Sequence, residues 1–297
     1  MFSINNLFNN ANMQCINQLG QYRVFEHQKD LSVSPYNAET AYFSAEMNVR
    51  RRQVLVELNN TSCKLQAGAM QWMLGNVSMQ SGVSAGNFLG KALGAAVTGE
   101  TMSKPEYTGQ GYVMLEPTYK HILLVDVAQW GQIVLEDGLF LACDSTLQHK
   151  VVSRKTLSSA ALGGEGLFNL SLSGQGIAVL ESPVPQQELI MFNLQDDEVK
   201  IDGNMAIAWS GSLSFTVEKS SKSLIGSAVS GEGLVNVYRG SGKIWLAPVL
   251  ETGGSAGVSS PQNAGETASE GHTGSAAARN DTMSKIEKFG KFMDKFS

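Results

Sequence analysis

The feature that most constrains this chain is a pattern that occurs three times along it. The segments GETMSKPEYTGQGYVMLEP, GGEGLFNLSLSGQGIAVLESP and GEGLVNVYRGSGKIWLAP each place two glycines, one residue apart, before an apolar run that ends at proline. These glycines are Gly109 and Gly111, Gly174 and Gly176, and Gly240 and Gly242. A second pattern, a glycine followed by an apolar stretch, precedes each copy at Gly68, Gly138 and Gly203. Because both patterns recur at roughly 65 residues, the sequence predicts three similar units, 38–117, 118–183 and 184–250.

Within each unit the residues are typical of β-strands. Short runs such as HILLVDV, ELIMFNL and KIWLAP are rich in aliphatic and aromatic residues and are bounded by Gly, Pro, Asn, Asp or Ser. We interpret the paired glycines as hairpin turns in which glycine supplies a positive φ. No helix-forming run follows them, as a phosphate-binding loop would require. The sequence therefore predicts an all-β fold of three repeated units in sandwich-like or barrel-like sheets.

The residues on either side of the repeats differ from them in composition. Residues 1–37 are expected to form an N-terminal extension, and residues 251–282, rich in Gly, Ser, Ala and Thr, a flexible linker. Residues 283–297 are predicted to form a short amphipathic helix. Its apolar face consists of Ile286, Phe289, Phe292, Met293 and Phe296. A helix this short is marginal alone, so docking on its own or a neighbouring copy, on a partner protein or on an anionic membrane all remain open.

Composition excludes several classes of protein. A net charge of −5 disfavours general nucleic-acid binding, which needs a basic face. The cysteines Cys15, Cys63 and Cys143 have neither zinc-site spacing nor the even number of a disulfide framework. The first 20 residues lack the basic and apolar regions of a secretory signal, so a cytoplasmic protein is expected.

These motifs resemble the altered inheritance of mitochondria protein 24 family. The resemblance rests on the GGEGL and GxG elements, the IWL run, the GAM turn and the threefold repetition, and it covers about residues 50–250. It implies three units similar to the tryptophan RNA-binding attenuator protein, in a compact homo-oligomer for which a trimer is one expected form. A shared fold does not bring the attenuator protein's RNA or tryptophan site, and no nucleic-acid partner is expected.

The candidate site residues are three carboxylates that recur with the repeats, Glu100, Glu165 and Glu232. They would form a ring around a pseudo-threefold axis, or each would cap backbone N–H groups or meet a Lys or Arg. Two other charged runs each have two candidate roles. Arg50 to Arg52 would bind an anion or protect a strand edge, and Asp196 to Glu198 would bind a cation or form a solvated turn.

The histidines have no partner at metal-ligand spacing, and no nucleophile motif is present. We therefore expect no metal, no cofactor and no enzymatic activity. The hypothesis favoured by the sequence is a non-catalytic oligomeric scaffold or adaptor whose tail helix contacts a partner or membrane surface. The alternative is a small-ligand or lipid-binding module with a pocket between β units.

Overall fold

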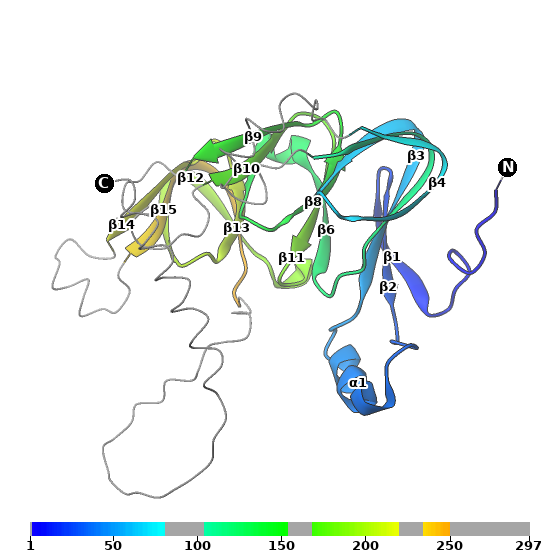
Figure 1. Ribbon diagram of the computed structural model, residues 1–297. Coiled ribbons are helices and arrows are strands. Elements are labelled where there is room, and N and C mark those ends of the chain that lie inside the picture. Colours follow the sequence, from blue (N-terminus) through cyan, green and yellow to red (C-terminus); the bar gives the residue numbers. More distant parts are fainter. Residues whose placement is uncertain (1, 81–103, 154–167, 220–233, 250–297) are drawn as a thin grey trace, which may run out of the picture. The chain divides into compact units, whose positions relative to one another are not determined.

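The computed structural model describes residues 2–80, 104–153, 168–219 and 234–249 (Figure 1). The described residues form two antiparallel sheets of eight and seven strands. The first sheet contains β1 (Met13–Leu19), β2 (Tyr22–His27), β3 (Arg52–Leu65), β4 (Met70–Gln80), β5 (Glu106–Leu115), β6 (His121–Asp126), β8 (Phe140–Asp144) and β11 (Ile177–Ser182). The second contains β7 (Gln132–Leu135), β9 (Gln148–Ser153), β10 (Phe168–Ser173), β12 (Ile190–Asp202), β13 (Ala206–Ser210), β14 (Ser214–Lys219) and β15 (Leu234–Leu246). The all-β prediction is confirmed.

Three segments of the chain, which correspond to the predicted units 38–117, 118–183 and 184–250, pair their strands in a similar way. In the first, β5 lies between β3 and β4, and in the last, β15 lies between β12 on one side and β13 and β14 on the other. The middle segment has this arrangement twice, once in each sheet. β10 lies between β7 and β9 in the second sheet, and β11 lies between β6 and β8 in the first.

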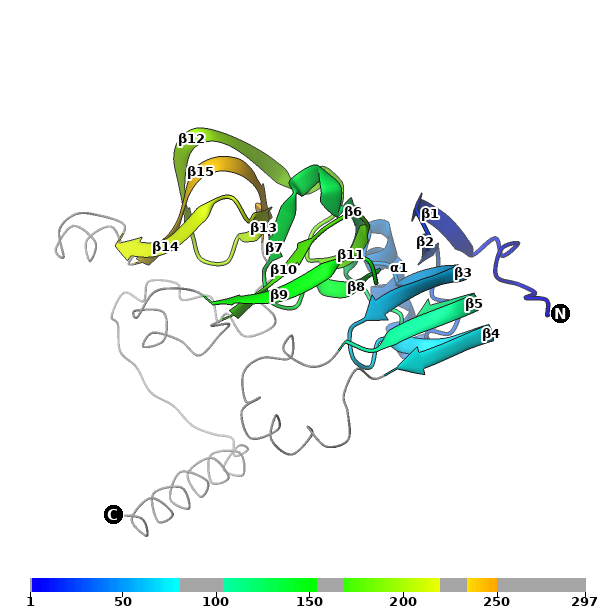
Figure 2. The same cartoon turned by 90° about the horizontal axis from the view of Figure 1, so that it is seen from above.

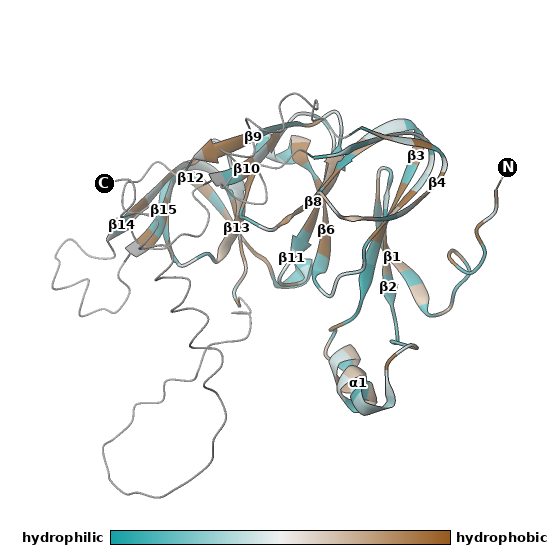
Figure 3. Cartoon of the chain, viewed as in Figure 1, coloured by the Kyte–Doolittle hydropathy of each residue, from teal (hydrophilic) through white to brown (hydrophobic). Residues whose placement is uncertain are grey.

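The middle segment therefore belongs to both sheets (Figure 2). Three breaks divide its strands between the two sheets. The 3-10 turn η4 (Val127–Trp130) separates β6 from β7, residues 145–147 separate β8 from β9, and residues 174–176 separate β10 from β11. The largest core cluster accordingly draws on both sheets, with Phe140 of β8, Leu172 of β10 and Ala208 of β13 all buried. Hydrophobic and hydrophilic stretches alternate along these strands (Figure 3).

The interpretation of the paired glycines as hairpin turns is wrong. Gly109 and Gly111 lie inside the continuous strand β5, and Gly240 and Gly242 lie inside β15. Gly174 and Gly176 lie between β10 and β11, which do not pair with each other. All but Gly242 have a positive φ. The physical reason for glycine in β5 is close approach, because a Cβ on Gly109 would overlap the carbonyl oxygen of Asn76 in β4.

Residues 1–37, expected as an extension, supply two strands of the first sheet. β1 pairs with β2, and β2 pairs with β3, so that the hairpin extends the sheet of the first segment. The side chains of Tyr22 and Val24 in β2 are completely buried in the hydrophobic core. The strands were hard to foresee because β1 is exposed almost throughout and alternates poorly.

The connection between β2 and β3 contains the α-helix α1 (Ala38–Glu46), preceded by the 3-10 turn η1 (Pro35–Asn37). The sequence predicted a helix at 283–297 but not α1. Pro35 opens the first turn, where its missing N–H costs nothing, and no β-branched run opposes a helix here. In Figure 1, α1 lies beyond the ends of β1 and β2 and away from the other strands.

The predicted linker, 251–282, and tail helix, 283–297, with its face of Ile286, Phe289, Phe292, Met293 and Phe296, lie outside the described residues.

Candidate functional site

A buried ion pair lies at the base of the connection between β2 and β3, which contains α1. Arg52, only 2% exposed, donates from Nη2 to Glu26 Oε2 at 2.8 Å and to Asn48 Oδ1 at 2.8 Å. Glu26 is itself 7% exposed at the end of β2. A charge this deeply buried needs its partner, so this pair fixes where the connection leaves β2 and where it returns to β3.

The other two arginines of the run bind the same connection. Arg50 donates to Gln28 Oε1 at 2.8 Å, to Glu26 Oε1 at 3.2 Å and to the carbonyl of Ala45 at 3.1 Å. Arg51 contacts Asp30 Oδ2 at 2.7 Å and donates to the Tyr119 hydroxyl at 2.9 Å. All three arginines thus have partners within the protein, and Arg50 contacts α1 directly at Ala45.

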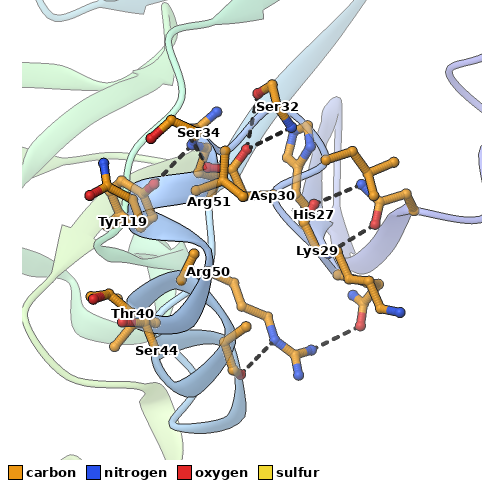
Figure 4. Close-up of a pocket in the computed structure, with 18 residues that line it drawn as sticks. His27, Lys29, Asp30, Ser32, Ser34, Thr40, Ser44, Arg50, Arg51 and Tyr119 are labelled. Carbon is orange, nitrogen blue, oxygen red and sulfur yellow. Dashed lines mark hydrogen bonds and ion pairs between the residues drawn. The ribbon is translucent and has the colours of Figure 1, made fainter.

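A cavity of about 760 Å³ lies between residues 27–34 and one face of α1 (Figure 4). Thr40 and Ser44 of α1 line it on one side, and His27, Asp30 and Arg51 on the other. Apolar atoms come from Val33, Ala41, Ala45 and Val49. The volume suits a small molecule, and the lining offers cationic, hydroxyl and apolar contacts together.

The outer side of α1 is more apolar than the side that lines the cavity. No residue of α1 is buried. Tyr42 is 62% exposed, Phe43 is 59% exposed and Met47, just beyond the helix, is 78% exposed. The preceding Tyr36 is 98% exposed, and the rings of Tyr42 and Phe43 meet edge to face at 5.4 Å. We call Tyr36, Tyr42, Phe43 and Met47 the α1 surface. Large contiguous apolar side chains in solvent are typical of an interaction site.

A family model described as Mitochondrial biogenesis AIM24 matches residues 44–249. The chain belongs to this family. An uncharacterized protein of Streptococcus pyogenes serotype M6 is 30% identical over 194 residues, which are 62% of this chain and 76% of that protein. The crystal structure of a Streptococcus pyogenes protein from a structural genomics programme is similar with a TM-score of 0.51 and 26% identity, covering 69% of this chain and 90% of that one. The resemblance to the family seen in the sequence is thereby confirmed.

The AIM24 match begins inside α1, so β1, β2 and most of the helix precede it. The cavity is therefore lined by both parts, with Asp30 from the preceding residues and Arg51 from the matched ones. The partners of the arginine run, Glu26 and Asp30, also lie ahead of the match.

The three repeated carboxylates, Glu100, Glu165 and Glu232, lie outside the described residues. The acidic run Asp196 to Glu198 forms neither a turn nor a cation site. It lies inside β12 as a bulge opposite Gly240 and Gly242, and Asp196 has a φ of 54°. Glu198 binds Arg239 of β15, so the run is an exposed irregularity of a curled strand.

Other residues with reactive side chains are scattered. Cys63 and Cys143 are buried and Cys15 is exposed, all with free thiols. Burial raises the pKa of Cys143 to about 12, so its thiol stays protonated and unreactive. His121 of β6 and His149 of β9 lie in different sheets. Burial, with the charge of Arg52, lowers the pKa of His121 to about 4. Among the described residues there is no group of three or more metal-ligating side chains.

The arginine run could be identified from the sequence, but its partners and the α1 surface could not. A usable signal was present, because SPYNAETAYFSAEM places a proline at a helix start and contains several helix-forming residues. In the part of the chain that the structure describes, no helix has the length and apolar character to cross a membrane.

Proposed function

We propose that this AIM24 family member is a non-catalytic adaptor whose β-sheets present the α1 surface to a partner protein. The observation that supports this proposal is the orientation of α1, which turns small and hydroxyl residues to the cavity and aromatic residues to solvent. Folding alone would favour the reverse arrangement, because exposed Tyr42 and Phe43 gain no burial. A partner that covers the α1 surface would bury them.

A protein is a better fit for this surface than an anionic membrane. Helices that lie on such membranes carry Lys and Arg on their polar face. α1 contains Glu39 and Glu46 and neither Lys nor Arg, and the nearby Arg50 and Arg51 are bound to Glu26 and Asp30. Aromatic residues and methionine are also the side chains enriched at protein interfaces.

Site-specific photo-crosslinking in cells tests this proposal. A photoreactive residue in place of Phe43 should give one dominant protein adduct, which the additional change Met47→Lys should abolish. The matched control replaces Ile16 of β1, which is 48% exposed but lies outside the α1 surface, and should give none. Lipid adducts alone, or equal labelling from both positions, would refute the proposal.

The tail adds a second contact in this proposal. Its apolar stripe, described above, is the sequence feature that supports it, and a linker of about 30 residues gives the helix a wide reach. Deleting residues 251–297 should weaken association with the partner while leaving the melting temperature of the sheets unchanged. Unchanged association would remove the tail from the proposal. Fractionation of the same cells tests the proposed cytoplasmic location.

A second candidate function, binding of a small ligand, is favoured by the cavity. The cavity lies beside α1, whereas the sequence hypothesis placed it between β units. Its mixture of the Arg51–Asp30 ion pair, hydroxyls and apolar atoms suits a small polar molecule with an apolar portion. Native mass spectrometry of the purified protein should then show a bound small molecule that Arg51→Gln removes. Arg23→Gln is the control, because Arg23 is also paired, with Glu57 at 2.7 Å, but does not line the cavity.

A further inference from the structure

One face of the first sheet carries a row of polar side chains from β3, β5 and β4, which lie next to one another with β5 in the middle (Figure 2). Gln110 of β5 is opposite Asn59 on one side and Asn76 on the other. Tyr112, two residues further along β5, is opposite Glu57. Opposite residues of an antiparallel pair carry their side chains on the same face. Three carboxamides therefore form a row across the sheet, and Tyr112 belongs to the next row.

The N-terminal residues turn this face into a pocket of about 670 Å³. Leu7, which is 6% exposed, is buried against the sheet, and Phe8 packs on Tyr112 with ring centroids 6.0 Å apart. The ring of Phe2 meets Tyr112 edge to face, also at 6.0 Å. Phe2, Tyr112, Glu57 and the three carboxamides all line the pocket. The pocket thus combines two aromatic rings with a row of polar groups.

Glycine makes room for this pocket. Gly75 of β4 and Gly111 of β5 are opposite each other and line it. A Cβ on Gly75 would lie 3.1 Å from Cε1 of Phe2 and 2.7 Å from the carbonyl oxygen of Gln110, both closer than an ordinary contact. The absence of a side chain at Gly75 therefore lets the Phe2 ring lie over the strands.

The carboxamides of Asn59, Asn76 and Gln110 are available to a ligand. All three residues are exposed. In the described part of the chain none of these side chains forms a hydrogen bond, since the bond of Asn59 to Thr61 comes from its backbone N–H. A carboxamide donates through nitrogen and accepts through oxygen, so each can bind a hydroxyl group in either direction. Adjacent strands are about 5 Å apart, which is also about the length of one hexose unit.

The charge in this pocket is neutralised within the protein. Of the described residues that line it, Glu57 alone is charged, and its Oε2 accepts a hydrogen bond from Nη2 of Arg23 at 2.7 Å. The guanidinium of Arg23 also lies 5.5 Å from the centre of the Phe8 ring, beside the N-terminal residues. A phosphate group needs cations to neutralise it. Because no described lining residue is a cation, the pocket favours a neutral ligand over a nucleotide.

We propose that this pocket binds a neutral saccharide, with the C–H face of a sugar ring on Phe2 and Tyr112 and the hydroxyl groups on the carboxamide row. A pyranose has both features, because its axial C–H groups form an apolar face and its hydroxyl groups donate and accept. Aromatic rings beside carboxamides match the two together. An extended peptide is instead bound through the backbone of a strand edge, whereas these side chains lie on the face of paired strands.

This site is separate from the α1 surface and from the cavity beside α1. That cavity is lined by residues from 27–34, α1 and the arginine run, and among the described residues it shares no lining residue with the pocket on the sheet. The variant Arg51→Gln, which should remove a ligand from the cavity, should therefore leave saccharide binding unchanged. The inference stands or falls separately from the proposed adaptor function.

Isothermal titration calorimetry and saturation-transfer NMR with the full-length protein test the proposal. The probes are the neutral saccharides maltotriose, cellotriose and chitotriose, and AMP is the charged comparison with an aromatic base. We expect at least one saccharide to bind at millimolar concentration or below, and AMP to bind more weakly. Binding of none of the three saccharides at millimolar concentration, or tighter binding of AMP, would overturn the proposal.

Two variants of exposed carboxamides separate binding from folding. Asn76→Ala and Gln110→Ala should each weaken saccharide binding by about three- to tenfold, as expected for one hydrogen bond, while the melting temperature stays unchanged. The matched control is Gln80→Ala, since Gln80 is an exposed carboxamide of β4 that lies outside the pocket. Equal affinities of the three variants and the unmodified protein would refute the assignment of the ligand to this pocket.

The aromatic rings provide a second readout. Their ring current should move the NMR signals of the bound sugar's C–H protons upfield. Phe2→Leu keeps an apolar side chain at a position that is 46% exposed, so it should preserve folding while it reduces this shift and weakens binding several-fold. Identical sugar proton shifts with Phe2→Leu and with the unmodified protein would place the saccharide elsewhere and refute the proposed site.

Discussion

Gly109 and Gly240 occupy the same place in the repeated pattern, but the structure predicts different costs for replacing them by alanine. Both have a positive φ, 141° and 113°, which alanine adopts only with strain. At Gly109 a Cβ would overlap the carbonyl oxygen of Asn76, which belongs to the backbone of β4. At Gly240 the nearest atom, the carbonyl oxygen of Ser212, is 3.8 Å from the Cβ position, an ordinary contact.

The backbone strain is common to both variants and amounts to about 1–3 kcal/mol. Gly109→Ala must in addition move β4 away from β5. Overpacking of this kind costs about 1–3 kcal/mol, and a weakened ladder hydrogen bond adds about 1 kcal/mol. We therefore expect Gly109→Ala to lower the free energy of unfolding by about 2–4 kcal/mol more than Gly240→Ala does.

Urea denaturation of the two variants, followed by circular dichroism, measures this difference directly. The slope of the unfolding free energy against urea should stay constant, so that the midpoint alone reports stability. Gly68→Ala is a further control, because its φ is 82° and no atom lies within 4 Å of the Cβ position. If Gly109→Ala and Gly240→Ala cost the same within about 0.5 kcal/mol, the close-approach explanation is wrong.

Three further predictions follow from the buried groups. Glu26→Gln should lower the free energy of unfolding by about 3 kcal/mol, because Arg52 remains buried without its carboxylate. Glu57→Gln at the partly exposed pair with Arg23 should cost under about 1 kcal/mol. Equal urea midpoints for the two variants would contradict this. His121, whose pKa is about 4 in the folded protein, should make stability fall as the pH decreases from about 6.5 to 4, because the unfolded chain takes up a proton that the folded chain does not. Melting temperatures of His121→Asn should show a shallower dependence on pH in this window, and an unchanged slope would exclude His121 as its source. Maleimide should label Cys15 in the folded protein while the buried cysteines react only after unfolding, and mass spectrometry that finds them labelled under native conditions would contradict their burial.

Much of the strand content could be predicted from the sequence, because burial in sheets selects the same residue types everywhere. The turn glycines Gly68 and Gly138 have positive φ in two-residue turns, as glycine after a strand indicates. The glycine pairs were misinterpreted because a glycine required for a turn and one required for close approach look alike in sequence. Only the neighbouring strand, here β4 against Gly109, distinguishes them.

Strand partners could not be predicted for a related reason. The pairing of β10 and β11 with different sheets depends on contacts far apart in the chain, which leave no local pattern. The third segment added a further difficulty, since the residue equivalent to Gly68 and Gly138 in the turn is Asn204, one position after Gly203. Trp72 is thus the third residue of β4, whereas Trp209 is the fourth residue of β13, one position further along its strand.

At the candidate site, the sequence indicated the cations but not what they bind. Arg52 and Glu26 are separated by a long connection, and nothing in either neighbourhood predicts that they meet. The α1 surface was missed because its residues are also typical of a core. Tyr42 and Phe43 would ordinarily be assigned to the interior, and their exposure follows only from the position of α1 at the end of the hairpin.

The division of the middle segment between two sheets has a consequence for synthesis and for dissection of the chain. The first sheet lacks β11 until residue 182 has left the ribosome, although most of its other strands are made by residue 126. Until then β6 has no partner among the strands described, and β8 lacks one of its two. A fragment cut between the segments would leave one sheet incomplete wherever the cut fell. Contacts of such long sequence separation fold slowly, and we expect the two sheets to form and to be lost as a single cooperative unit.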